Sequence, residues 1–267
     1  MADQTVPGGD KRLTIMGHLR ELRAALFRGV IAVAITTGIS FAFAKPIFDI
    51  LTYRAAPLQP VFDFLNNRLH LFAPPDLTLI AIELTEMIGT YMRVCLIVGV
   101  ILATPYLIFE LVKFISPALN RQERRRYIYT ALPWVASMFL VGVVFTYFIL
   151  LPPALRFLTT FGSDIAIIQV RIGNYVTIIS RLLLAVGLIF ELPVLTSFLA
   201  WIGVVTWRWL ANKRKWAALA AFLAGALVTP TLDPINQTLV AVPIILLYET
   251  SIWAAWLIQR RKRARAA

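Results

Sequence analysis

The sequence is poor in the residues that build most catalytic and metal sites. Its 267 residues include one cysteine, two histidines and 14 acidic residues, against 26 lysines and arginines. Cys95 lies inside an apolar run and has no second cysteine to pair with, so no disulfide can form within the chain. The sequence also lacks a phosphate-binding loop, a nucleophile set and a spaced group of metal ligands. We therefore expect no enzymatic activity, no metal and no cofactor.

Long apolar segments dominate instead, and 59% of the residues are hydrophobic. A segment of about 20 apolar residues is long enough to cross a hydrocarbon core of about 30 Å. Strands of a membrane β-barrel would alternate apolar and polar residues, which these continuous runs do not. The sequence thus predicts an all-α, polytopic membrane protein.

Six such segments divide the chain into an N-terminal arm (1–25), one six-helix transmembrane domain (26–258) and a basic tail (259–267). The predicted spans are Leu26–Phe48, Met87–Phe114, Tyr127–Leu151, Tyr175–Val205, Trp216–Thr229 and Leu239–Ile258. The last two are short, which predicts tilting, a thinned bilayer or a close-packed hairpin. Two short core helices of the soluble type are the alternative. The segment at about residues 49–86 contains four prolines and is expected to form a small ordered cap.

Basic residues gather on one side of these spans. The arm, the second-to-third loop, the fourth-to-fifth loop and the tail hold seventeen, whereas the other side holds four, with Lys45 at a span end. Because lysine and arginine mark cytoplasmic loops, both termini are predicted to be cytoplasmic. The net charge of +12 follows from this distribution, so it does not indicate nucleic-acid binding. His18 and His70 fall on opposite sides and cannot share a metal.

The arm carries Met16, Leu19, Leu22 and Leu26 at helical spacing. This pattern predicts an interfacial amphipathic helix that runs into the first span. Periodicity alone also fits a plain membrane anchor.

The loop between the second and third spans holds a single carboxylate, Glu123, among four arginines. Asn120 and Glu123 have the spacing of a capping box at the start of the third span. Glu123 could also accept a bidentate guanidinium from a binding partner, and its two oxygens allow both. The neighbouring Arg124–Arg126 mainly set topology and would interact with anionic lipid.

Two acids fall inside predicted spans. Glu191 lies in the fourth span, next to Pro193, which is expected to kink the helix near Ile189. A carboxylate at this depth should face protein or water, so Glu191 either makes an internal hydrogen bond, contacts a partner helix or relays protons. Glu249, in the last span, has no partner that the sequence identifies.

The predicted hairpin between the fifth and sixth spans brings Thr229, Asp233 and Gln237 to one edge. Turn chemistry explains Asp233 without any function. Thr229 and Gln237 lie in apolar flanks and are candidates for hydrogen bonds between helices.

Several short motifs occur in a fixed order along the chain. They are His18-Leu-x-Glu-Leu-Arg23, Thr85-Glu86, Phe114-x-Ser-Pro-x-Leu119 with Glu123-Arg124, Phe145-x-Tyr-Phe148 with Pro152, Phe190-Glu-Leu-Pro193, Thr229-Pro230 with Asp233 and Gln237, Pro243, and Leu247-Tyr-Glu249. On a six-span protein with both ends inside, this set resembles the TatC family, the receptor core of the twin-arginine protein translocase. Thr231 and Leu232 depart from the family pattern, which leaves Asp233 without an assigned role.

The resemblance implies that the chain sits in the inner membrane of a prokaryote and binds twin-arginine signal peptides of folded cargo. Transport would use the proton-motive force, small single-span TatA- and TatB-like partners, and further copies of the chain. Glu123 would pair with a signal-peptide arginine, and the rest of that site would consist of Leu19, Glu21, Arg23, Phe114 and Arg124. Glu191 would face the transported segment or a partner helix, and Thr229 and Gln237 would meet a partner helix. The alternative function is a proton-coupled transporter of small solutes with Glu191 and Glu249 as relay groups.

Overall fold

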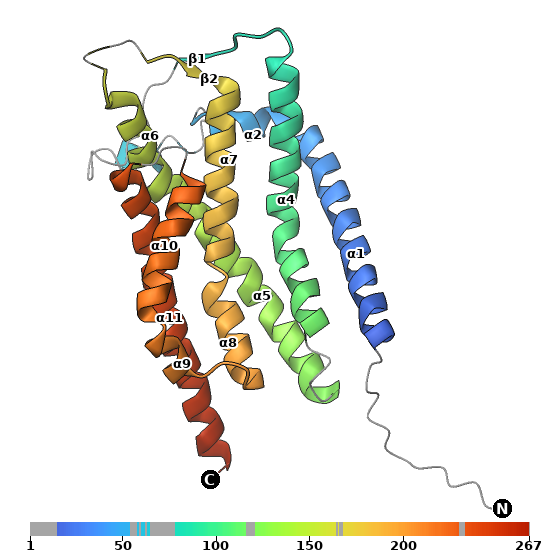
Figure 1. Cartoon of the computed structure of the whole chain (residues 1–267). Helices are drawn as coiled ribbons and strands as arrows, with labels where there is room; N and C mark the ends of the chain where they lie inside the picture. The colour runs from blue at the N-terminus through green and yellow to red at the C-terminus, as the bar shows by residue number, and fades with distance from the viewer. Residues whose placement is uncertain are drawn as a thin grey trace, which may run out of the picture.

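The protein is a bundle of long helices in which α1 begins and α11 ends at the same end (Figure 1). The computed structural model describes residues 15–53, 58, 60–61, 63–64, 78–115, 121–163, 165, 168–229 and 233–266. The longer elements are α1 (Ile15–Ala42), α4 (Glu86–Ile115), α5 (Arg121–Phe145), α7 (Ile172–Ile189), α8 (Leu192–Ile202), α10 (Arg214–Val228) and α11 (Pro234–Ala266). The shorter ones are α2 (Ala44–Leu51), the π-helical turn Thr146–Leu150, α6 (Leu151–Thr160), α9 (Trp207–Asn212), β1 (Leu79–Ile80) and β2 (Val170–Arg171).

Among the described residues, five helical segments are long and apolar enough to cross a membrane, with α7 and α8 counted as one segment. The sixth predicted span corresponds to α11, and the fifth to α10, which has 15 residues. At 1.5 Å per residue α10 is about 22 Å long, so it is short for a full crossing, as predicted. The last helix is longer than predicted, with 33 residues. Its basic tail extends the helix beyond the apolar run because arginine, lysine and alanine are good helix formers.

Neighbouring helices pack in the order α1, α4, α7, with α5 crossing behind α4 and α7 and with α10 and α11 on the far side (Figure 1). The largest group of buried residues surrounds α7 and includes Tyr175, Val176, Ile179 and Val186. The strands β1 and β2 pair in parallel, with Leu79 opposite Val170. This pairing joins the segments that precede α4 and α7 at the outer end of the bundle.

Prolines decide where several helices end or break. Helix α1 stops at Ala42 and not at the predicted Phe48, because Pro46 lacks the N–H that would bond to the Ala42 carbonyl. Likewise α7 ends at Ile189 and α8 begins at Leu192, which confirms the break predicted from Pro193.

The third span continues past its predicted end at Leu151 and reaches Thr160 through α6. The π-helical turn precedes Pro152 and Pro153, neither of which can donate a backbone hydrogen bond. Thr146 Oγ1 donates to the Gly142 carbonyl at 2.7 Å within this stretch. The two prolines thus loosen the span and do not end it.

Helices α1 and α4 come close together at Gly99. A Cβ at this position would lie 2.7 Å from both the backbone N and the Cα of Thr37. Thr36 Oγ1 also donates to the Gly99 carbonyl at 2.7 Å. A glycine is therefore required for this packing distance.

We expect Gly99→Ala to destabilise the protein by about 1–3 kcal/mol, the usual range for inserting atoms into a filled core. Gly89, on the same helix, has no atom within 4 Å of an added Cβ, so Gly89→Ala should leave stability unchanged or raise it slightly. Thermal unfolding can be followed with a thiol-reactive dye, because Cys95 is buried and is the one cysteine in the chain. Equal melting temperatures for the two variants would contradict the packing argument.

Candidate functional site

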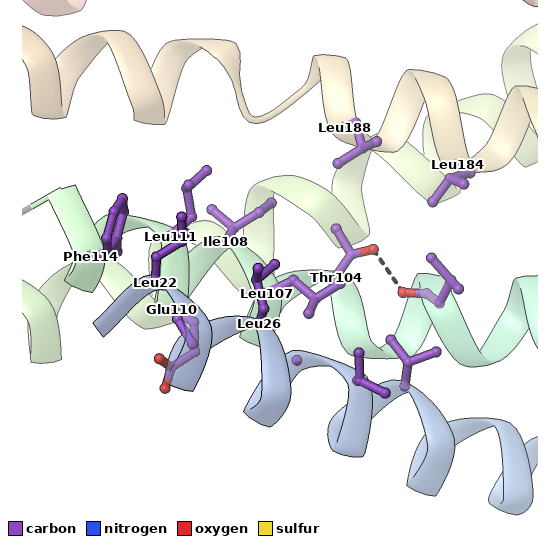
Figure 2. Close-up of a pocket in the computed structure, with 15 residues that line it drawn as sticks. Leu22, Leu26, Thr104, Leu107, Ile108, Glu110, Leu111, Phe114, Leu184 and Leu188 are labelled. Carbon is purple, nitrogen blue, oxygen red and sulfur yellow. Dashed lines mark hydrogen bonds between the residues drawn. The ribbon is translucent and has the colours of Figure 1, made fainter. Parts of the chain in front are cut away.

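An apolar groove opens between α1, α4 and α7, with a volume of about 580 Å³. Leu22 and Leu26 line it from α1, Phe114 from α4, and Leu184 and Leu188 from α7 (Figure 2). Leu22 and Phe114 lie toward the end where α1 begins and α4 finishes, which the charge distribution places in the cytoplasm. The groove therefore runs from the cytoplasmic end into the apolar part of the bundle.

A buried carboxylate lies beside the cytoplasmic part of this groove. The side chain of Glu110 is 6% exposed, and its Oε2 lies 2.7 Å from Nη2 of Arg28. Tyr106 donates to Oε1 at 3.2 Å, and Nζ of Lys113 lies 3.5 Å from the same oxygen. The cluster ties α1 to α4 where the groove opens.

Sequence reasoning missed this cluster. Arg28 falls within the first predicted span, and Glu110 and Lys113 fall within the second. Charged residues inside apolar spans are rare and usually pair with one another, and that signal would have identified them.

The arm residues predicted for peptide binding lie on the first turns of α1. Leu19, Glu21 and Arg23 are all exposed there, and His18 lies outside the described side chains. Phe114, also predicted for this site, lines the groove from the end of α4. The structure therefore places the three arm residues on the same helical turns as Leu22, which lines the groove, and leaves their side chains accessible.

Glu123 and Arg124 lie in the first turn of α5, which begins at Arg121, the residue after Asn120. This start agrees with a cap at Asn120, but the loop 116–120 and the side chains of residues 121–132 lie outside the described part of the chain. The predicted contacts of Glu123 therefore stay predictions.

Glu191 lies at the break between α7 and α8 and is 1% exposed. Neither of its carboxylate oxygens makes a hydrogen bond within the described part of the chain. The helices pack closely at the preceding residue, since a Cβ on Gly142 would lie 2.8 Å from the side chain of Phe190. The internal hydrogen bond considered from the sequence is thus not found among these residues.

The hairpin of α10 and α11 uses its polar residues internally. Gln237 Nε2 donates to the Phe222 carbonyl at 2.8 Å, and Thr229 Oγ1 donates to the Gly225 carbonyl at 2.8 Å. The predicted hydrogen bond between helices is confirmed for Gln237, whereas Thr229 bonds within its own helix. Asp233 has a structural role, because its Oδ1 accepts a hydrogen bond from the backbone N–H of Asn236 at 2.7 Å and so caps α11.

Glu249 has a partner that the sequence did not reveal. Arg214 donates to its two oxygens at 2.7 and 2.8 Å, from Nε and Nη2. Arg214 opens α10, so this bidentate pair lies toward the cytoplasmic end of the hairpin. The structure thus supplies the partner that the sequence did not identify, and the pair links α10 to α11.

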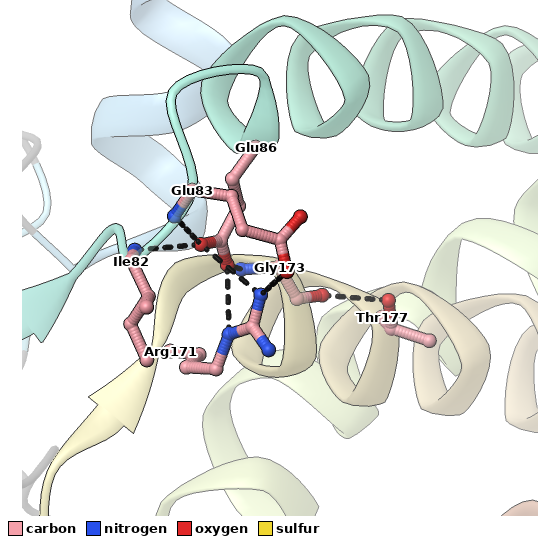
Figure 3. Close-up of polar contacts among 6 residues, drawn as sticks. All are labelled: Ile82, Glu83, Glu86, Arg171, Gly173 and Thr177. Atoms are coloured by element: carbon pink, nitrogen blue, oxygen red, sulfur yellow. Dashed lines mark hydrogen bonds and ion pairs between the residues drawn. The ribbon is translucent and has the colours of Figure 1, made fainter.

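A second carboxylate cluster orders the outer end of the bundle (Figure 3). Glu86 accepts hydrogen bonds from the backbone of Ile82 at 2.8 Å and of Gly173 at 3.3 Å. Nη2 of Arg171 lies 3.3 Å from Oε2 of Glu86 and 3.1 Å from Oε1 of Glu83. These hydrogen-bonded carboxylates raise the pKa of Arg171 above its ordinary value, so the guanidinium stays charged. The cluster joins the start of α4 to the start of α7.

Known proteins match the chain over most of its length. The family described as Sec-independent protein translocase protein (TatC) matches residues 17–243. A Sec-independent protein translocase protein TatC from Aquifex aeolicus is 36% identical over 248 residues, which are 92% of this chain and 96% of that protein. The protein of the same name from Carboxydothermus hydrogenoformans is 33% identical over 253 residues, 95% of this chain and 97% of that protein. A crystal structure of the twin-arginine translocase receptor TatC matches with a TM-score of 0.74 and 36% identity, and covers 91% of this chain and 99% of that chain. The chain therefore belongs to the TatC family, whose members are multi-pass membrane subunits of the Sec-independent protein translocase and not enzymes.

Proposed function

We propose that this chain is the receptor subunit of a twin-arginine translocase and takes the signal peptide of a folded cargo protein at its cytoplasmic end. The observation that carries the proposal is the apolar groove between α1, α4 and α7. A secretory signal peptide has a basic segment followed by about 7–15 apolar residues. The groove supplies an apolar surface of matching character, and its volume lies within the range of about 300–1,000 Å³ found for ligand pockets.

The basic segment of the peptide would meet the polar groups beside the groove. Glu21 is exposed on the first turns of α1, and Glu123 lies in the first turn of α5. Arginine pairs with carboxylates through two parallel hydrogen bonds, which gives geometric selectivity for a guanidinium over an ammonium. Leu19 and Phe114 would pack against the peptide between these charges and the groove, while Arg23 and Arg124 would limit which peptides approach.

Single-span partners of the TatA and TatB type would dock on the α10–α11 hairpin and near Glu191. The Oε1 of Gln237 makes no hydrogen bond within the described residues, so it can accept one from a partner helix. The buried, unpaired carboxylate of Glu191 is a second group that a transported segment or partner helix could satisfy. Transport driven by the proton-motive force, with several copies of the chain in the complex, completes the proposal.

Site-specific photocrosslinking tests it directly. A photoreactive residue at Leu188, which is 44% exposed in the groove, should crosslink to the signal peptide of a twin-arginine precursor in membranes. The same residue at Trp253, which is 66% exposed on α11, is the control and should not. A precursor with two lysines in place of the arginines should lower the yield at Leu188. Equal crosslinking from both positions would contradict the proposal.

A solute transporter is the competing function, and one observation weighs against it. A proton relay would need Glu191 and Glu249 free to change protonation, but Arg214 holds Glu249 in a bidentate pair. Proton-coupled solute flux by the purified chain alone in liposomes would favour the transporter.

A further inference from the structure

Two arginines inside the spans belong neither to the apolar groove nor to the α10–α11 hairpin. Arg93 lies on α4 and Arg181 on α7, and both are exposed. Nη1 of Arg93 donates to Oγ1 of Thr177 at 2.8 Å. Thr177 precedes Arg181 by four residues, so the two stand one above the other on the same helix face. Arg93, Thr177 and Arg181 therefore lie along one short stretch of the α4–α7 seam.

Neither arginine has a carboxylate partner within the described residues, where no acidic oxygen lies within 4.0 Å of them. Three other arginines near or within the helical spans differ in this respect. Arg28 pairs with Glu110, Arg171 with Glu83 and Glu86, and Arg214 with Glu249. A cation within a span that has no carboxylate partner among these residues can take an anion from outside the chain.

The depth of the two residues indicates where that anion lies. Both α4 and α7 begin at the outer end, where Glu86 and Arg171 form their cluster. Arg93 is seven residues into α4 and Arg181 nine residues into α7, so their Cα atoms lie about 10 and 14 Å along the helices. Helical side chains lean toward the N-terminus, and arginine stems extend to reach polar surroundings. Both charged groups therefore reach toward the outer boundary of the hydrocarbon core.

The surface below the arginines is apolar. Leu184 and Leu188 follow Arg181 by three and seven residues and line the upper part of the groove (Figure 2). Met92 and Leu96 flank Arg93 and are exposed. A paired positive charge at the boundary with an apolar track beneath it matches the shape of an amphiphile.

We propose that Arg93, Thr177 and Arg181 bind the phosphate of an outer-leaflet phospholipid, one acyl chain of which lies along Leu184 and Leu188. The forked guanidinium matches the oxygens of a phosphate, and two forks can hold one phosphate together. Every phospholipid of the outer leaflet carries this group at the boundary that the arginines reach. A carboxylate on a partner helix would instead have to lie within the hydrocarbon core, where a charged group is costly. The phosphate site lies toward the outer end of the seam, whereas its acyl chain would share Leu184 and Leu188 with the groove proposed for the signal peptide. The lipid test uses no peptide, so its outcome does not depend on the peptide-binding proposal.

Native mass spectrometry of the delipidated protein in mild detergent tests this site. We expect the wild-type chain to retain one more phosphatidylglycerol or phosphatidylethanolamine molecule than Arg93→Gln/Arg181→Gln, with at least a tenfold loss of affinity in the double variant. A phosphate-free glycolipid with the same acyl chains should bind both proteins equally weakly. Inorganic phosphate should not compete at matched concentration, because it lacks the chains. Arg208→Gln, a change at an exposed cytoplasmic arginine, is the control and should bind lipid as the wild type does.

Equal lipid retention by the wild type and the double variant would overturn the proposal, and so would equal binding of the glycolipid and the phospholipids to the wild type. Competition by inorganic phosphate at matched concentration would also overturn the lipid assignment. Loss of a co-purified partner subunit from the double variant, with lipid retention unchanged, would assign the arginines to a partner carboxylate instead.

Arg93→Lys/Arg181→Lys keeps the charges and should retain part of the binding. Melting followed at Cys95 shows whether each variant is folded.

Discussion

Glu191→Lys is expected to abolish export of a twin-arginine substrate, whereas Glu191→Gln should keep most of it. The side chain is 1% exposed and lies at the break between α7 and α8. A lysine there would place an ammonium among apolar groups, and a charge at the centre of a span costs about 2.5–3.5 kcal/mol even on the insertion scale. A glutamine keeps the size and the hydrogen-bonding atoms of the acid without its charge.

Local packing makes the effect of lysine larger. Gly142 and Gly187 allow α5 and α7 to approach beside Glu191, and a Cβ at Gly187 would lie 2.8 Å from the ring of Phe139. The longer side chain of lysine has no free volume to enter and would force these helices apart. Both the charge and the volume therefore oppose this substitution.

Export of a twin-arginine reporter measures the effect in cells that lack their own copy of the subunit. Membrane levels of each variant and melting followed at Cys95 separate a transport defect from misfolding. Glu83→Gln, at an exposed carboxylate of the outer end, is the control and should export normally. If Glu191→Gln were as defective as Glu191→Lys, the charge itself and not its burial would be required, and the argument from burial would fail.

Much of the fold could be predicted from the sequence because its determinants are local. Apolar length located the spans, basic residues oriented them, and Pro193 located the break near Ile189. The early end of α1 and the loosened turn before Pro152 follow the same chemistry of a missing N–H, which the sequence already contained. The length of α11 was underestimated because a basic helical tail carries no hydropathy signal.

The paired charges could not be predicted in the same way. Arg28 and Glu110 are 82 residues apart in the sequence, and Arg214 and Glu249 are 35 apart. Their pairing depends on which helix packs on which, and hydropathy does not encode that order. The groove was missed for the same reason, since Leu22, Phe114 and Leu188 meet only when α1, α4 and α7 are assembled.

Glu123→Lys is expected to weaken binding of a twin-arginine peptide by about 10- to 100-fold, because a hydrogen bond to a charged group contributes about 1.5–3 kcal/mol and each 1.4 kcal/mol is tenfold. Glu123 is the one carboxylate of its loop and is followed by three arginines. Without Glu123, this basic loop has no carboxylate to accept a guanidinium. A lysine there also adds repulsion against the incoming arginines.

Two substitutions separate recognition from helix capping. Glu123→Gln keeps a side chain that can complete a capping box with Asn120, so the melting temperature should stay near that of the wild type while peptide affinity falls. Arg126→Gln, three positions further along, removes a positive charge outside the proposed site and should not lower the affinity. Binding is measured with a fluorescent twin-arginine peptide and the purified protein, beside a twin-lysine peptide.

Glu21→Gln should lower affinity further when added to Glu123→Gln, because Glu21 is the exposed carboxylate on the first turns of α1 at the same end of the groove. If Glu123→Gln lowered the melting temperature and left affinity unchanged, Glu123 would act only as a cap, and recognition of the arginines would have to reside on α1.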